Sequence, residues 1–339
     1  SGYKAVSDTH VGDWGTQFGI LLYGYKNLSD EEREEIQKNP FQGLNDLYVS
    51  MNKQIEERSE LRESAKQEFA KLERGDKENR RAWEWMVKIS MKKLEETANR
   101  LKLLPFDEHK GESSYEKDMP AIVALAVKKG IAEKTADGAI IIDLTKDGLD
   151  EAVLIKSDGA STYLLRDLAT ILYRKKHWKF SKNPYVVDTR QLHHFKQVFR
   201  VAELLGFEGV GESEHVAVGF MSLPEGPMST RKGTVIPLHA VLDDVIGRAS
   251  EIIQEKNPDL KNKNVVAEAV GLGALKYFDL LHHRKSDVVF NREQSLSFEG
   301  NTAPYIQYTH ARFRSILRKL QVKSSMLKGS AMDTEERIL

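Results

Sequence analysis

Tyr185-Val186-Val187-Asp188 is a short apolar run that ends in a carboxylate, and it lies between two segments predicted to be helical, residues 162–175 and 195–205. A second apolar run follows at residues 215–220. Strands that alternate with helices in this way pair in parallel. The pattern therefore predicts a Rossmann-like half-sheet and an α/β fold.

The part of the chain before this half-sheet has a different character. Residues 3–11 are predicted to be a short strand that runs into Gly12-Asp13-Trp14-Gly15-Thr16-Gln17-Phe18-Gly19, where the glycines allow a tight turn and close backbone approach. A helix begins behind this turn. Residues 28–104 have capping residues and helical spacing, which predict a helical hairpin whose second helix follows Gly75-Asp76.

A mixed stretch joins the hairpin to the half-sheet, and helices follow it. Pro105 and residues 111–114 are predicted to be loop, residues 120–129 a helix that ends at Gly130, and residues 139–144 and 152–155 two strands around a turn. From residue 240 onward the pattern predicts helix, with an interruption near Pro258 and a loop near Asn291.

Composition sets limits on the class of protein. The 339 residues are 40% hydrophobic and 30% charged, with a formal net charge of zero and no cysteine. We expect no disulfide, no thiolate metal site, no bilayer-spanning segment and no secretory signal. Charge is unevenly distributed, because residues 166–200 hold nine Lys or Arg against two Asp. A solvated helical surface is the commoner explanation of such a run.

Four segments carry side chains suited to chemistry. In the first, Tyr163 and Asp167 are four residues apart and share a helix face, so the ring and the carboxylate suit a planar cation. In the second, the polar run from Asp188 to His194 follows a strand, where ligands bind in parallel sheets. Taken alone, a core tyrosine beside a surface acid is the commoner explanation of the first, and the two adjacent histidines of the second do not form a metal site.

The third segment is Pro227-Met228-Ser229-Thr230-Arg231-Lys232-Gly233-Thr234, a donor-rich loop of the kind that binds phosphates. It lacks the spacing of a P-loop, and a basic surface turn is the alternative. The fourth, residues 297–312, interleaves aromatic and basic side chains, which suits nucleic acid as well as it suits a helix with a basic outer face.

Together, residues 10–19, 157–167, 191–197, 228–233 and 298–312 resemble the characteristic stretches of the arginyl-tRNA synthetase family, in the same order. The resemblance implies a class I Rossmann catalytic domain split by an inserted subdomain, followed by an α-helical anticodon-binding domain. The boundaries it implies are catalytic first half 1–27, insertion 28–156, catalytic second half 157–238, helical connection 239–296 and start of the anticodon-binding domain 297–339.

The resemblance also implies roles for individual residues. Arginine would be bound by Tyr163, Asp167 and Gln191, and ATP by Met228, Ser229, Lys232 and His194. Ser229, Thr230, Arg231 and Lys232 would be catalytic, because they would stabilise the charge on the departing pyrophosphate. Tyr305, Tyr308 and Arg312 would contact tRNA.

The loop departs from the usual class I form, which has lysines where Pro227 and Thr230 stand here. The first class I signature, His-Ile-Gly-His or similar, is absent, so we expect a chain truncated at both ends with impaired activity. The expected function is ATP-dependent activation of arginine and its transfer to tRNA(Arg). The alternatives are a non-catalytic tRNA-binding relative and another class I synthetase.

The expected partners are arginine, tRNA(Arg) and ATP, whose Mg²⁺ comes with the nucleotide and not from a tightly bound metal of the protein. We expect a cytoplasmic monomer without membrane contact.

Overall fold

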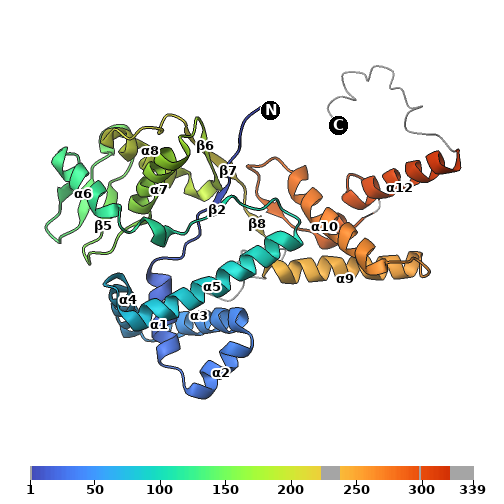
Figure 1. Ribbon diagram of the computed structural model, residues 1–339, viewed down its shortest axis with the longest axis horizontal. Helices are drawn as coiled ribbons and strands as arrows, with labels where there is room; N and C mark the ends of the chain where they lie inside the picture. The colour runs from blue at the N-terminus through green and yellow to red at the C-terminus, as the bar shows by residue number, and fades with distance from the viewer. Residues whose placement is uncertain (1, 223–236, 298, 321–339) are drawn as a thin grey trace. The chain divides into compact units, whose positions relative to one another are not determined.

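The computed structural model describes residues 2–222, 237–297 and 299–320 (Figure 1). The chain divides into two compact units. The described part of the first comprises residues 2–220 and Arg284–Asp287, and that of the second comprises residues 221–222, 237–283, 288–297 and 299–320. None of the described helices is both long enough and apolar enough to cross a membrane.

The predicted half-sheet is present in the first unit. Strand β6, Asn183–Asp188, pairs in parallel with β7, Ser213–Val218, over six residue pairs. Helix α7, Tyr163–Trp178, precedes β6, and α8, Leu192–Leu205, connects the two strands beside the ladder (Figure 1). Helix α8 ends as predicted at Gly206, whose φ of 75° lies in the left-handed region that glycine adopts readily.

A small antiparallel sheet shares its core with α7 and α8. Strands β3, Glu133–Lys134, β4, Ile140–Ile142, and β5, Ala152–Ile155, follow helix α6, Met119–Lys128. Leu144, just after β4, and Leu154 of β5 are fully buried in the cluster that contains Leu165 and Val198. The prediction of α6, β4 and β5 is confirmed, whereas β3 was missed because a two-residue strand has no periodicity.

The first predicted strand, residues 3–11, was too long. Only Asp8–Thr9 form β1, which pairs in parallel with β2, Glu108–His109. The loop predicted at residues 111–114 was partly wrong, because Glu112–Tyr115 form a 3-10 turn. The β1–β2 pairing joins residues 100 apart in sequence, and local patterning does not report such a contact.

The predicted helical hairpin was wrong in helix number. After α1, Thr16–Lys26, come α2, Asp30–Lys38, α3, Pro40–Glu57, α4, Glu60–Glu73, and α5, Lys77–Arg100. Proline at the first position of α3 separates it from α2, because proline has no N–H to continue the earlier helix. The cap expected near residue 29 is present, since Ser29 forms a capping box with Glu32. Asp76 accepts in the same way from the backbone at the start of α5.

Helices α1 and α4 pack closely at Gly19, one of the glycines that were expected to allow close backbone approach. A Cβ on Gly19 would lie 2.2 Å from the backbone oxygen of Ala65, so only glycine fits there. Trp14 is fully buried between the rings of Phe69 and Trp83. The Trp83 indole Nε1 donates to the Asp13 carbonyl at 2.7 Å, which connects the glycine-containing turn to α5.

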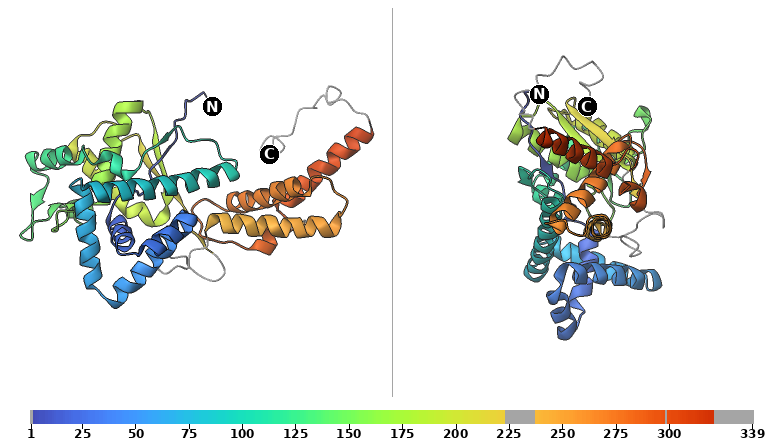
Figure 2. Two further views of the ribbon diagram at one scale, coloured as in Figure 1. Left: turned by 60° about the horizontal axis from the view of Figure 1, so that its bottom comes forward. Right: turned by 90° about the vertical axis from the view of Figure 1, so that its right-hand side faces the viewer.

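The second unit is mainly helical, as predicted. Helix α9, Leu238–Lys256, and helix α10, Lys263–Leu281, run side by side (Figure 2). Helices α11, Arg292–Ser295, and α12, Ala303–Lys319, follow. The prediction of helix with an interruption near Pro258 and a loop near Asn291 did not include β9, Val288–Val289, which pairs in parallel with β8, Met221–Ser222.

Candidate functional site: a buried carboxylate between two histidines

Asp167 lies on α7 with a side chain that has lost most of its water. The residue is 8% exposed. Its Oδ2 lies 2.6 Å from Nε2 of His194 on α8, and its Oδ1 lies 3.5 Å from Nε2 of His10, which follows β1. Three separate elements therefore converge on one carboxylate.

The packing of α7 explains this position. Leu164, Leu165, Leu168 and Ile171 are buried on α7, and Asp167 is part of the same buried segment. Helix α8 packs against α7 through its own apolar side chains, and Phe195 is among them. His194 precedes Phe195, so the packing that buries Phe195 in the core places His194 at the edge of that core, within reach of Asp167.

A second buried pair lies near this carboxylate. Nε of Arg166 is 2.6 Å from Oε2 of Glu112, although the N–H is not aligned as in a hydrogen bond. Burial raises the pKa of Glu112 to about 7, the carboxylates of Asp167 and Asp13 add to the increase, and the Arg166 guanidinium opposes it. Glu112 thus has one guanidinium and two further carboxylates as electrostatic neighbours.

Asp13 is held in this group by the backbone. It accepts hydrogen bonds from the backbone N–H of Ser113 at 2.9 Å and from the Ser113 hydroxyl at 2.6 Å. A Cβ on Gly111 would lie 2.2 Å from the Asp13 carboxylate, so glycine makes room for it. Neither bond brings a positive charge, which leaves the local excess of carboxylates in place.

The neighbouring pair of Arg174 and Asp8 is complete in itself. Nη2 of Arg174 donates to both carboxylate oxygens of Asp8 at 3.2 and 3.0 Å, and the guanidinium carbon lies 4.7 Å from the Tyr185 ring centroid. Each charge has a partner in bonding distance. This pair therefore has the character of a structural link between β1 and α7.

The structure places the other predicted arginine ligands at the edge of the site. Tyr163, at the start of α7, is 61% exposed, and its ring lies 5.0 Å from the Arg166 guanidinium carbon. Gln191 is exposed at the N-cap of α8, three residues before His194. The described contacts join Asp167 to His194 and do not join it to Tyr163 or Gln191.

The remaining predicted site residues fall elsewhere. Met228, Ser229, Thr230, Arg231 and Lys232 lie outside the described residues. Tyr305, Tyr308 and Arg312 lie on α12 of the second unit, where all three are exposed and their spacing places them on one helix face.

Sequence reasoning missed His10, Asp13, Glu112 and Arg166 as members of this group. His10 and Asp13 belong to a motif that was recognised, but no local pattern assigned a task to either side chain. Glu112 lies in a segment predicted to be loop. Only a tertiary contact between residues 100 apart connects the Glu112 segment to Asp13, through Ser113.

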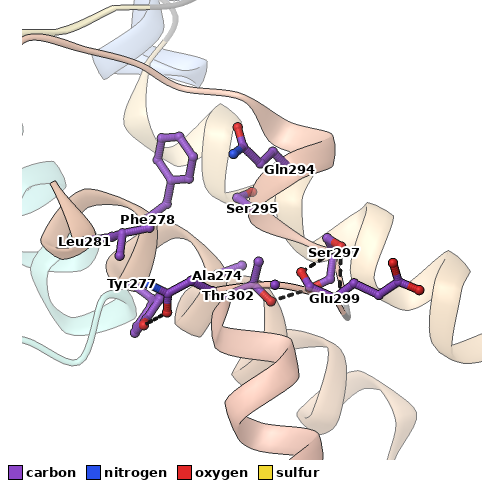
Figure 3. A pocket seen from close by; sticks show the side chains of 11 residues that line it. Ala274, Tyr277, Phe278, Leu281, Gln294, Ser295, Ser297, Glu299 and Thr302 are labelled. Carbon is purple, nitrogen blue, oxygen red and sulfur yellow. Dashed lines mark hydrogen bonds between the residues drawn. The ribbon is translucent and has the colours of Figure 1, made fainter. Parts of the chain in front are cut away.

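A pocket of about 330 Å³ lies in the second unit, and it was not predicted. Phe278 and Leu281 of α10 line it together with polar side chains among residues 294–297 and 299–302 (Figure 3). The Tyr277 hydroxyl is hydrogen-bonded to the Asn301 side chain, and the Thr302 hydroxyl donates to the Ser297 carbonyl at 2.5 Å. None of its lining residues was among the predicted ligands.

Sequence comparison relates the chain to known proteins. A family model described as tRNA synthetases class I (R), catalytic domain, matches residues 1–292. An arginine–tRNA ligase of Halothermothrix orenii is 39% identical over 335 residues, which are 99% of this chain and 58% of that relative. A relative of the same name from Streptococcus uberis is 43% identical over 318 residues, 94% of this chain and 56% of the relative. The chain thus spans little more than half the length of these relatives.

Solved structures agree with this relationship. The crystal structure of arginyl-tRNA synthetase from Plasmodium falciparum is similar with a TM-score of 0.75 and 26% identity, over 93% of this chain and 52% of that one. The Thermus thermophilus arginyl-tRNA synthetase has a TM-score of 0.76 at 24% identity, over 97% of this chain and 60% of that one, which supports the fold. With the family model matching most of its length, the chain belongs to the class I arginyl-tRNA synthetase family.

Proposed function

We propose that this chain carries the arginine-recognising part of an arginine–tRNA ligase, and that Asp167 binds the substrate guanidinium. The observation that carries the proposal is the state of Asp167, which is buried and has only two histidines as ionic partners among the described residues. With Glu112 and Asp13 close by, the site has more carboxyl groups than cations. A bound guanidinium would correct that imbalance.

The same proposal assigns the flanking residues. Tyr163 would stack on the planar guanidinium, and Gln191 would donate or accept a hydrogen bond at the polar end of the ligand. Guanidinium binding by a carboxylate separates arginine from citrulline, which has no charge, and from lysine, whose ammonium is a point charge. A site of this kind rejects ligands that leave a buried polar group unpaired.

The reaction that follows is the one the family performs. The arginine carboxylate would attack the α-phosphate of ATP to give arginyl-adenylate and pyrophosphate, and a hydroxyl of the terminal ribose of tRNA(Arg) would then attack the adenylate carbonyl. We propose Met228, Ser229, Lys232 and His194 as ATP contacts. Ser229, Thr230, Arg231 and Lys232 would stabilise the pyrophosphate charge, with Mg²⁺ supplied by the nucleotide.

Transfer to tRNA would use the second unit. Tyr305, Tyr308 and Arg312 would contact tRNA from α12 by stacking and phosphate binding. The proposed division of the chain is catalytic segments at residues 1–27 and 157–238 around an insertion at 28–156, a connection at 239–296, and the start of an anticodon-binding domain at 297–339. We propose that the chain acts as a monomer.

Calorimetric titration of the chain with arginine, citrulline and lysine tests the proposal. We expect arginine to bind in preference to both, and Asp167→Asn to weaken arginine binding about 100-fold because the buried charge partner is lost. Asp137→Asn is the matched control, since this aspartate lies in the exposed turn before β4 and bonds only within that turn. Equal binding of arginine and citrulline by the unmodified chain would contradict the proposal.

A further inference from the structure

His194 holds one oxygen of Asp167 and leaves the other less committed. Its Nε2 lies 2.6 Å from Oδ2, the distance of a charge-assisted hydrogen bond. An ionised carboxylate only accepts hydrogen bonds, so the imidazole proton of this contact belongs to Nε2 of His194. Any contact of His194 with ATP would then come from its other nitrogen, Nδ1.

The opposite side of the carboxylate is different. Nε2 of His10 lies 3.5 Å from Oδ1, too far for a strong hydrogen bond. Burial lowers the pKa of His10 below its ordinary value of 6.5, against the opposing effect of Asp167, so the ring is uncharged at neutral pH. An uncharged ring at this distance competes weakly with a cation for Oδ1.

We propose that His194 is a positioning residue for arginine recognition: it fixes Oδ2 of Asp167 so that Oδ1 is presented to the guanidinium. The inference rests on the proposed function and deepens it. An aspartate without this contact would be free to rotate about its side-chain torsions and would have to be ordered by each ligand molecule. Holding it in advance removes that entropy loss from binding.

The adjacent histidine provides a matched control. His193 is also in the first turn of α8, but its Nε2 lies 3.2 Å from Asp150, in the segment before β5, and not beside Asp167. Its side chain is half exposed. Replacing His193 therefore removes a histidine and an ion pair from the same turn without touching the proposed site.

The test is arginine and citrulline titration of four chains: unmodified, His194→Ala, His194→Gln and His193→Ala. We expect His194→Ala to weaken arginine binding about 3- to 10-fold, the size expected for ordering one side chain, and to leave citrulline binding unchanged. Glutamine can place an amide N–H where the imidazole Nε2 stood, so His194→Gln should restore most of the affinity. His193→Ala should match the unmodified chain.

A spectroscopic measurement tests the positioning contact without any ligand. Nitrogen NMR of ¹⁵N-histidine-labelled chain should show His194 protonated at Nε2, and Asp167→Ala should change that signal while leaving the His193 signal in place. A His194 signal that ignores Asp167→Ala would overturn the inference.

The outcomes separate the two proposals. If the unmodified chain does not prefer arginine to citrulline, the proposed function fails and this inference fails with it. If the unmodified chain prefers arginine and His194→Ala prefers it equally, only the inference fails.

Discussion

Two buried glutamates of the first unit have opposite electrostatic surroundings. Glu68, on α4, accepts from Lys26 Nζ at 3.0 Å, from Lys71 Nζ at 2.6 Å and from the Asn79 amide at 2.9 Å. Burial alone would raise the pKa of Glu68, but these bonds lower it to about 2. Glu112, beside Asp167, has one guanidinium and two further carboxylates as neighbours, and its pKa is raised to about 7.

The two glutamates differ in how completely other residues of the chain compensate their negative charge. In the helical region the negative charge is fully paired by residues of the chain, so nothing further is needed to stabilise it. At the Asp167 site the carboxylates of Glu112, Asp167 and Asp13 have only the Arg166 guanidinium among the charges that act on Glu112, so their charge is less completely compensated. Strongly perturbed groups of this second kind are typical of ligand sites.

Of the substitutions that test this comparison, Asn79→Ala is expected to change the free energy of unfolding most. Asn79 is fully buried, its amide donates to the backbone oxygen and side chain of Glu68, and its oxygen accepts from Lys26. We expect the free energy of unfolding to fall by about 2–4 kcal/mol, because buried groups lose their partners.

Denaturant unfolding followed by tryptophan fluorescence measures this change, since Trp14, Trp83 and Trp85 all lie in or beside these helices. Asn52→Ala is the control, because Asn52 makes one local bond to the Tyr48 carbonyl. Similar losses in the two variants would show that the Glu68 network has no special importance.

The next effect is the pH dependence caused by Glu112. Its folded pKa, about 7, lies above the ordinary value of 4.5, so its contribution to stability is present below pH 4.5 and is lost as pH rises through about 7. We expect about 1–3 kcal/mol of stability to be lost from this group between pH 5 and pH 8.

Glu112→Gln should remove this decrease in stability with rising pH. Unfolding of the unmodified chain and of the variant between pH 5 and pH 8 measures the difference. The difference between the chains isolates Glu112 from His10, whose lowered pKa produces a slope of opposite sign. Parallel curves for the two chains would mean that Arg166 keeps Glu112 ionised throughout.

The smallest effect is expected from Glu68→Gln. The folded pKa of Glu68 lies below the ordinary 4.5, so its contribution is present above pH 4.5 and is lost as pH falls through about 2. We expect a loss of about 1–2 kcal/mol at pH 7, reduced by the solvent exposure of Lys71, and a difference that narrows below pH 4.5.

Unfolding measured from pH 7 to pH 3 checks this window. Glu63→Gln is the control, since Glu63 forms an exposed pair with Lys66 on the same helix. A Glu68 effect that persists unchanged at pH 3 would contradict the assigned window.

Local patterns predicted the elements that have strong periodicity or clear ends. Helix α8 and its end at Gly206, the cap at Ser29, and the β6–β7 order are examples, because hydrophobic spacing and capping act over a few residues. The number of helices in residues 28–104 was wrong because the charged spacing of that region does not mark every break. β1 was predicted too long because a two-residue parallel pairing has no local signature.

The sequence by itself determined the family, the parallel half-sheet and the candidacy of Asp167, since each depends on residue identity and spacing along the chain. Only the tertiary structure decided that His10, Glu112 and His194 surround that aspartate. These residues come from segments far apart in sequence, and whether a carboxylate is paired or open depends on which charges folding brings within a few ångströms. Residue spacing along the chain does not contain that information.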